Sequence, residues 1–174
     1  MATIDLIVLG MLKKEPLSAY EIQKLVEYRR ISQWVKISTP SIYKKVIQLE
    51  EKGLISGIPV KEGKMPEKSV YSLTESGQRE FERLMLEIAS RPIQLYLDVN
   101  AVIVNLAGLS PEHQDRCLAD IGSNVAILKA RLEDNIRSKE GVADIPEMGM
   151  AVLNQQYILA EALEEWIDSM KRSR

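Results

Sequence analysis

The chain has 174 residues, a length that fits one compact domain or two small ones. Apolar residues make up 45% and charged residues 28%, which are ordinary values for a globular protein with a buried core. No apolar run reaches the roughly 20 residues that a membrane-spanning helix needs, and a single cysteine, Cys117, excludes an internal disulfide framework. The N-terminal residues lack the basic start and the cleavage site of a secretory signal. We therefore expect a cytoplasmic protein with no membrane partner.

The formal net charge is −2, but the basic residues are unevenly distributed along the chain. Between Lys36 and Lys68, seven lysines stand against four glutamates. From Arg91 onward, nine basic residues stand against thirteen acidic ones. A locally basic segment joined to an acidic remainder suits a protein that meets phosphate with one face only.

Two helices are predicted before residue 31. Apolar residues at helical spacing predict the first from Ile4 to Leu12, and Pro16 disfavours its continuation. Ser18 and Glu21 have the spacing of a capping box, which predicts the start of a second helix.

The third predicted helix, residues 39–52, has the clearest boundaries. Ser38 or Thr39 is the expected N-cap, Pro40 suits a first-turn position, and Gly53 marks the C-terminal stop. Three apolar residues share one side and attach the helix to the body, which leaves the remaining faces to polar residues. The three are Ile42, Val46 and Leu49.

Two short strands, residues 54–60 and 69–73, are predicted next. A loop from Lys61 to Lys68 joins them, so they form a hairpin. Residues 74–77 then open a fourth helix that ends near Pro92. Three helices followed by a hairpin are the order of a winged helix-turn-helix domain, in which one helix fits the major groove of DNA and the hairpin reaches the backbone.

The rest of the chain is predicted to be helical. Ser110 and Pro111 begin a long helix with apolar residues three and four apart, and a final helix follows Pro146. We predict a mainly α fold with a small β-hairpin wing. Residues 1–91 would form the DNA-binding domain, and residues 92–174 an antiparallel helical dimerisation domain that also suits effector binding. The predicted dimerisation residues are Leu153, Ala160, Leu163, Trp166, Ile167 and Met170.

Several short motifs occur in a fixed order over about half of the chain. They are Leu9-Gly10-Met11-Leu12, Pro16-Leu17, Tyr20-Glu21-Ile22, Trp34, Ser41-Ile42-Tyr43, Leu49-Glu50-Glu51-Lys52-Gly53-Leu54-Ile55 and Tyr71-Ser72-Leu73-Thr74-Glu75-Ser76-Gly77. In these motifs the sequence resembles the PadR-like transcriptional regulators. The resemblance implies a homodimer formed through the C-terminal helices, and usually repression that a small-molecule effector relieves.

The sequence also departs from the family pattern. Ser18-Ala19 stands where the family usually has His-Gly, and Lys44 stands where a proline commonly follows the tyrosine. The operator sequence therefore cannot be inferred by analogy. The candidate DNA-binding residues are Ser38, Thr39, Ser41, Tyr43, Lys44, Lys45, Gln48, Lys64 and Lys68.

Each candidate also has a plainer interpretation. Exposed lysines are often merely solvated, and Tyr43 could be a packed ring with its hydroxyl at the rim. Trp34 and Tyr96 are candidates for the wall of an effector pocket, although Trp34 could simply pack the helix pair. His113 and Cys117 lie four residues apart, as metal ligands can, but no further His or Cys exists, so we predict no metal site.

No nucleophile–base pair or Gly-rich phosphate loop is present, so we predict neither an enzyme nor a cofactor. The leading hypothesis is a cytoplasmic homodimeric repressor that binds a pseudo-palindromic operator in double-stranded DNA and is released by a small-molecule effector. The alternative is a winged-helix module for protein–protein interaction without DNA binding. The net charge and the acidic residues Glu50, Glu51 and Glu67 keep that alternative open.

Overall fold

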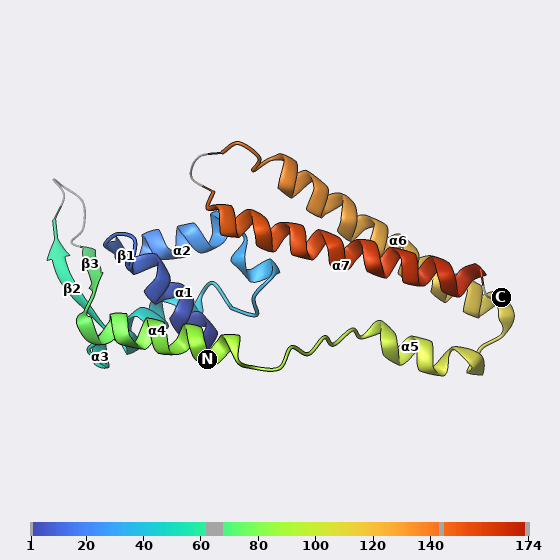
Figure 1. The fold of residues 1–174 in the computed structure, drawn as a ribbon, viewed down its shortest axis with the longest axis horizontal. Coiled ribbons are helices and arrows are strands. Elements are labelled where there is room, and N and C mark those ends of the chain that lie inside the picture. Colours follow the sequence, from blue (N-terminus) through green and yellow to red (C-terminus); the bar gives the residue numbers. More distant parts are fainter. Residues whose placement is uncertain (1, 62–67, 143–144, 173–174) are drawn as a thin grey trace. The chain divides into compact units, whose positions relative to one another are not determined.

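The computed structural model describes residues 2–61, 68–142 and 145–172 (Figure 1). It separates into two compact units, Met1–Ile93 and Gln94–Arg174. The boundary predicted from the sequence lies two residues earlier. Mostly helical architecture with one small antiparallel sheet confirms the predicted fold class.

The first unit is built on helices whose apolar faces meet in one core. The core forms because the apolar positions of each helix recur three and four residues apart and so share one face. Residues that are fully buried in it include Val8, Leu9, Ile22, Val26, Ile42, Val46 and Leu49. The helices are α1 (Ala2–Leu12), α2 (Ala19–Tyr28), α3 (Ser41–Glu51) and α4 (Glu75–Ala89), with a 3-10 turn, η1 (Ile31–Gln33), after α2.

Helix α2 begins with the predicted capping box. The Ser18 hydroxyl accepts a hydrogen bond from the Glu21 amide, and the Glu21 carboxylate accepts one from the Ser18 amide at 2.7 Å. Two amides that a helix start would leave unpaired are thereby satisfied, so the entry of α2 is fixed locally.

The start of α3 differs from the prediction. Pro40 is the N-cap residue and no side chain caps the helix, so the assignment of Ser38 or Thr39 as N-cap is wrong. The Ser38 carbonyl accepts a hydrogen bond from the Ser41 amide at 3.0 Å and also one from the Ser41 hydroxyl. A tight turn of the backbone therefore satisfies the first amide of α3 in place of a side chain.

The end of α3 falls where Gly53 predicts it. Gly53 has a φ of +68°, which favours glycine because it has no Cβ. Its amide donates to the Glu50 carbonyl at 2.8 Å, and the Leu54 amide donates to the Leu49 carbonyl at 3.0 Å. This pair of bonds is a Schellman motif, which closes the helix and turns the chain into the sheet.

The sheet has the strand order β1-β3-β2 and is antiparallel throughout. The predicted hairpin is confirmed as β2 (Ile55–Val60) and β3 (Lys68–Leu73), with Ser56 opposite Ser72. Strand β1 (Leu17–Ser18) is not predicted, because two residues are too few to show an alternating pattern. It ties the start of α2 to the wing.

The second unit contains α5 (Val99–Asn105), a 3-10 turn η2 (Leu106–Gly108), α6 (Pro111–Arg137) and α7 (Glu147–Arg172). Ser110 caps α6 through the His113 amide and Pro111 occupies its first turn, as predicted. Helices α6 and α7 form an antiparallel pair (Figure 1). Lys129 on α6 lies 2.7 Å from the Glu164 carboxylate on α7, and the Tyr157 hydroxyl donates to Glu133 at 2.9 Å.

The apolar seam of α7 packs within its own chain. Leu153, Ala160 and Ile167 are at most 5% exposed, and Ile167 lies in one core cluster with α6. The other three predicted dimerisation residues, Leu163, Trp166 and Met170, are partly buried against that same cluster. Leu153, Ala160 and Ile167 are therefore already covered within the chain, because periodicity identifies an apolar stripe but not the helix that covers it. The dimer contact of the other three residues stays a prediction.

No helix within the described ranges is long and apolar enough to span a membrane.

Candidate nucleic-acid interface

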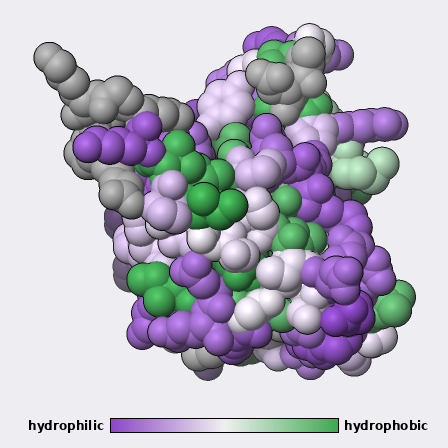
Figure 2. Space-filling model, turned by 90° about the vertical axis from the view of Figure 1, so that its left-hand side faces the viewer, coloured by the Kyte–Doolittle hydropathy of each residue, from purple (hydrophilic) through white to green (hydrophobic). Residues whose placement is uncertain are grey.

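Helix α3 has one buried and one exposed side. Its apolar residues Ile42, Val46 and Leu49 are fully buried against the core of the first unit. The opposite side carries Tyr43 and Ile47, which are 45% and 53% exposed, and the exposed Lys44. Figure 2 views the wing end of the structure, where green hydrophobic side chains are scattered among purple hydrophilic ones. The exposed side of α3 therefore offers polar, cationic and apolar groups together.

Lys45 does not belong to this exposed side. Its ammonium lies 2.8 Å from the Asp5 carboxylate of α1, and the two side chains are only 10% and 15% exposed. Lys45 follows Ile42 by three residues and precedes Leu49 by four, so it lies on the buried stripe of the helix. The structure therefore corrects its assignment as a DNA contact: Lys45 joins α3 to α1.

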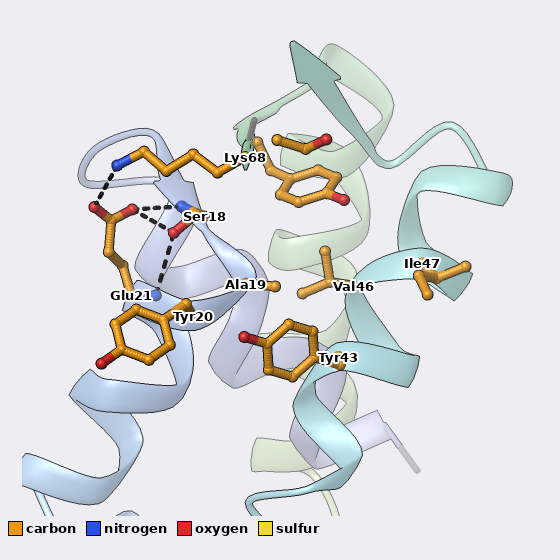
Figure 3. A pocket seen from close by; sticks show the side chains of 10 residues that line it. Ser18, Ala19, Tyr20, Glu21, Tyr43, Val46, Ile47 and Lys68 are labelled. Atoms are coloured by element: carbon orange, nitrogen blue, oxygen red, sulfur yellow. Dashed lines mark hydrogen bonds and ion pairs between the residues drawn. The ribbon is translucent and has the colours of Figure 1, made fainter. Parts of the chain in front are cut away.

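A cleft of about 580 Å³ lies between the start of α2, the exposed side of α3 and strand β3 (Figure 3). The rings of Tyr20 and Tyr43 lie near each other at its lower edge, and Lys68 extends from β3 across its upper side. The capping box of α2 and the pairing of β1 with β3 hold the start of α2 beside the wing, and α3 packs on the same unit through its buried apolar residues. The residues that line the cleft are Ser18, Ala19, Tyr20, Glu21, Tyr43, Val46, Ile47, Lys68, Ser69 and Tyr71.

Lys68 is held beside the start of α2 by Glu21. The Lys68 ammonium donates to the Glu21 carboxylate at 3.4 Å, while the other carboxylate oxygen accepts from Ser18 (Figure 3). The hydrogen bonds from the Ser18 side chain and backbone lower the pKa of Glu21, and the nearby Lys68 lowers it further. Glu21 is therefore ionised at neutral pH and ties the base of the wing to α2.

A second carboxylate beside the interface has a backbone partner. Glu50, at the end of α3, accepts a hydrogen bond from the Gly57 amide of β2 at 2.9 Å. A Cβ at Gly57 would lie 2.7 Å from that carboxylate and 2.8 Å from the Tyr71 ring, so the close approach requires glycine. Glu50 thus helps to fix α3 against the wing.

The remaining candidates occupy varied positions. Ser38 is exposed, whereas Thr39, Ser41 and Gln48 are half-buried along α3 and the turn before it. Lys64 lies outside the described residues.

The two candidates for an effector pocket belong to different units. Trp34 packs, partly buried, against the core of the first unit. Tyr96 is 82% exposed, and its hydroxyl donates to Gln94 at 2.5 Å. Trp34 therefore performs the packing role that its plainer interpretation proposes.

Sequence reasoning missed two exposed residues of the interface, Tyr20 and Ile47. A signal for Ile47 exists in the sequence: it follows Val46 directly and therefore lies off the apolar stripe of α3. Tyr20 lies between the two residues of the capping box and has no comparable signal.

Among the residues that the structure describes, no three His, Cys, Asp or Glu side chains gather in a way that could hold a metal ion.

The first unit is a winged helix-turn-helix domain, the fold of many DNA-binding proteins. It has three helices followed by a hairpin wing, and one side of the third helix is exposed. Residues 8–83 match the sequence model of the transcriptional regulator PadR-like family. This match confirms the resemblance found in the motifs: the winged unit is similar in sequence to that of the PadR-like family.

Solved structures with the same fold cover nearly the whole chain. Bacillus subtilis PadR in complex with operator DNA is 20% identical, with a TM-score of 0.84, over 100% of this chain and 99% of that one. The same protein in complex with p-coumaric acid is 19% identical, with a TM-score of 0.79, over 96% and 92% of the two chains. The Vibrio cholerae virulence activator AphA is 18% identical, with a TM-score of 0.71, over 95% and 94%. No curated protein matches the sequence.

Proposed function

We propose that this chain is a DNA-binding transcriptional repressor that acts as a homodimer on a pseudo-palindromic operator. The observation that carries the proposal is the outward side of α3, where Tyr43 and Lys44 lie next to a cleft that Lys68 of the wing also lines. The family match over residues 8–83 supports it, since that segment contains α3 and both strands of the wing.

Helix α3 would enter the major groove with its exposed side toward the base edges. Lys44 has no ion pair with any residue that the structure describes, so its charge is available for phosphate. Lys68 would reach the backbone from the wing, and each lysine that neutralises a phosphate releases condensed counterions. Two copies of α3 in one dimer would enter successive major grooves, about 34 Å apart.

The second unit would form the dimer. Leu163, Trp166 and Met170 are only partly buried and stay predicted contact residues, and other apolar residues of this unit would extend the contact. Tyr96, Val104 and Ile158 are exposed there, which leaves apolar area for a second copy. An operator bound by two copies needs such a contact, because one winged unit offers few cations and would bind DNA weakly.

Repression would follow because the bound dimer blocks access of RNA polymerase to the promoter. A small-molecule effector would release it by binding more tightly to a dimer whose two α3 helices are wrongly spaced for the operator. The p-coumaric acid complex of B. subtilis PadR, which has the same fold, supports an effector of that general kind. Trp34 and Tyr96 stay candidates for its contacts.

Binding of the purified full-length chain to promoter DNA tests the proposal. We expect a gel shift with the duplex upstream of its own gene, and an affinity that falls steeply between about 50 and 200 mM salt. No shift at low salt would contradict DNA binding. Sedimentation should show two chains on each operator duplex, and one chain per duplex would contradict the dimer.

A further inference from the structure

Ile47 is an apolar residue on the side of α3 that would face DNA. It is 53% exposed, although it belongs to an amphipathic helix with a complete set of buried apolar residues on the other side. Its side chain is therefore not needed for the core. It lines the same cleft as Tyr43 and Lys68, so it lies within the surface that the proposed function assigns to the operator.

An aromatic ring and two lysines lie near Ile47. Tyr43 precedes it by one helical turn, so the two side chains are neighbours on the helix surface. Lys44 lies on the same exposed side, and Lys68 lines the cleft from the wing. A ligand that fits here has an apolar group set among negative charges.

Double-stranded DNA presents such a combination in its major groove. The 5-methyl group of thymine is the one apolar feature of the base edges there, and it stands between two rows of phosphates. A charged or amide group gains nothing from that methyl group, whereas isoleucine can cover it and exclude water from it. We propose that Ile47, with Tyr43 beside it, reads the methyl group of a thymine in each operator half-site.

The proposal rests on the proposed function and adds a specificity-determining residue to it. Lys44 and Lys68 supply charge, which favours any duplex and carries little sequence information. Ile47 would instead distinguish thymine from cytosine, which has no methyl group and presents an amino group at the neighbouring position. The inference also gives the exposed isoleucine a reason to be apolar.

Deoxyuridine provides a direct test, because it pairs with adenine as thymine does and lacks only the methyl group. A duplex selected from a randomised pool by the full-length chain would be resynthesised with each thymine replaced singly by deoxyuridine. Fluorescence anisotropy would give the Kd of each duplex for the wild-type chain, for Ile47→Ala and for Leu86→Ala. Leu86, on α4, is 75% exposed and lies outside the cleft, so it is the matched control.

We expect one or two positions at which deoxyuridine weakens binding by the wild-type chain and by Leu86→Ala about fourfold for each methyl group lost. Ile47→Ala should bind the thymine and deoxyuridine duplexes equally well at those positions. Equal binding of all duplexes by the wild-type chain would overturn the inference, and this measurement does not depend on how any variant folds. A loss that persists in Ile47→Ala would also overturn it, since another residue would then read the methyl group.

The same experiment separates this inference from the function on which it rests. If no duplex is retained at low salt, the proposed function and the inference fail together. If duplexes bind with a strong salt dependence and ignore the methyl group, only the role of Ile47 fails. A winged-helix module that binds a protein partner and no DNA would give the first result.

Discussion

Adjacent lysines on α3 should have opposite roles, and substituting each by alanine tests the orientation of the helix. Lys45 forms a 2.8 Å ion pair with Asp5, and both side chains are largely buried. Removing the ammonium leaves the Asp5 carboxylate in the core without a counterion. We expect Lys45→Ala to lower the free energy of unfolding by about 3 kcal/mol, at the low end of the range for buried pairs because some solvent reaches both groups.

Lys44→Ala should affect DNA binding and leave stability unchanged. Lys44 is exposed, and a surface substitution of this kind changes the free energy of unfolding by about 0.5 kcal/mol or less. A plot of log Kobs against log salt concentration has a negative slope. Loss of one phosphate contact per protomer should make that slope less steep by about 0.9 for each protomer bound. Lys45→Ala, at a temperature where it is folded, should keep the wild-type slope.

Urea titration and anisotropy measurements over a salt series give both quantities for each variant. The double variant Asp5→Asn/Lys45→Met is the control, because it replaces the pair by two uncharged groups and should recover much of the lost stability. A Lys45→Ala protein of unchanged stability, or one whose salt slope falls as far as that of Lys44→Ala, would refute the orientation of α3 described above.

Three further substitutions test the first unit, and a fourth, Gly108→Ala in the second unit, is a control. Gly53→Ala should lower the free energy of unfolding by about 1 to 2 kcal/mol, because φ is +68° there, while Gly108→Ala, with open space around it, should be near neutral in the same urea titration. Gly77→Ala should cost about 3 kcal/mol or more in that assay, since its Cβ would lie 1.9 Å from the Leu54 carbonyl oxygen. Glu21 has a lowered pKa, so it contributes stability above its ordinary value of 4.5 that is lost as the pH falls through the folded value. In acid titrations followed by circular dichroism, Glu21→Gln should therefore lose less stability than the wild-type chain as the pH falls below 4.5.

The helix boundaries could be predicted from the sequence wherever a local signal fixes them. Ser18 with Glu21, Ser110 with Pro111, and Gly53 each act through backbone groups within a few residues, so their effect does not depend on the rest of the fold. Strand β1 could not be predicted, because its two residues are held by a partner strand more than fifty positions away.

The site shows the same division between local and distant causes. Tyr43 and Lys44 are exposed because the apolar stripe of α3 points the other way, and that stripe is visible in the sequence. The stripe also includes the position of Lys45, but burial of a lysine needs a partner, and Asp5 lies forty residues away on another helix. The ion pair between Lys45 and Asp5 therefore cannot be predicted from the periodicity of α3 alone.

Glu21 makes both a local and a distant contact, because its carboxylate caps α2 and also binds a lysine of the wing. Its oxygens accept from Ser18 and from Lys68, so the direction of α2 and the position of the base of the wing are fixed together. A phosphate that approaches Lys68 must compete with this carboxylate, and the contact therefore contributes less to affinity than a free lysine would. Replacing Glu21 with glutamine removes the competing charge and keeps an acceptor for the cap. If the wing meets the DNA backbone as proposed, that variant should bind the operator more tightly than the wild-type chain.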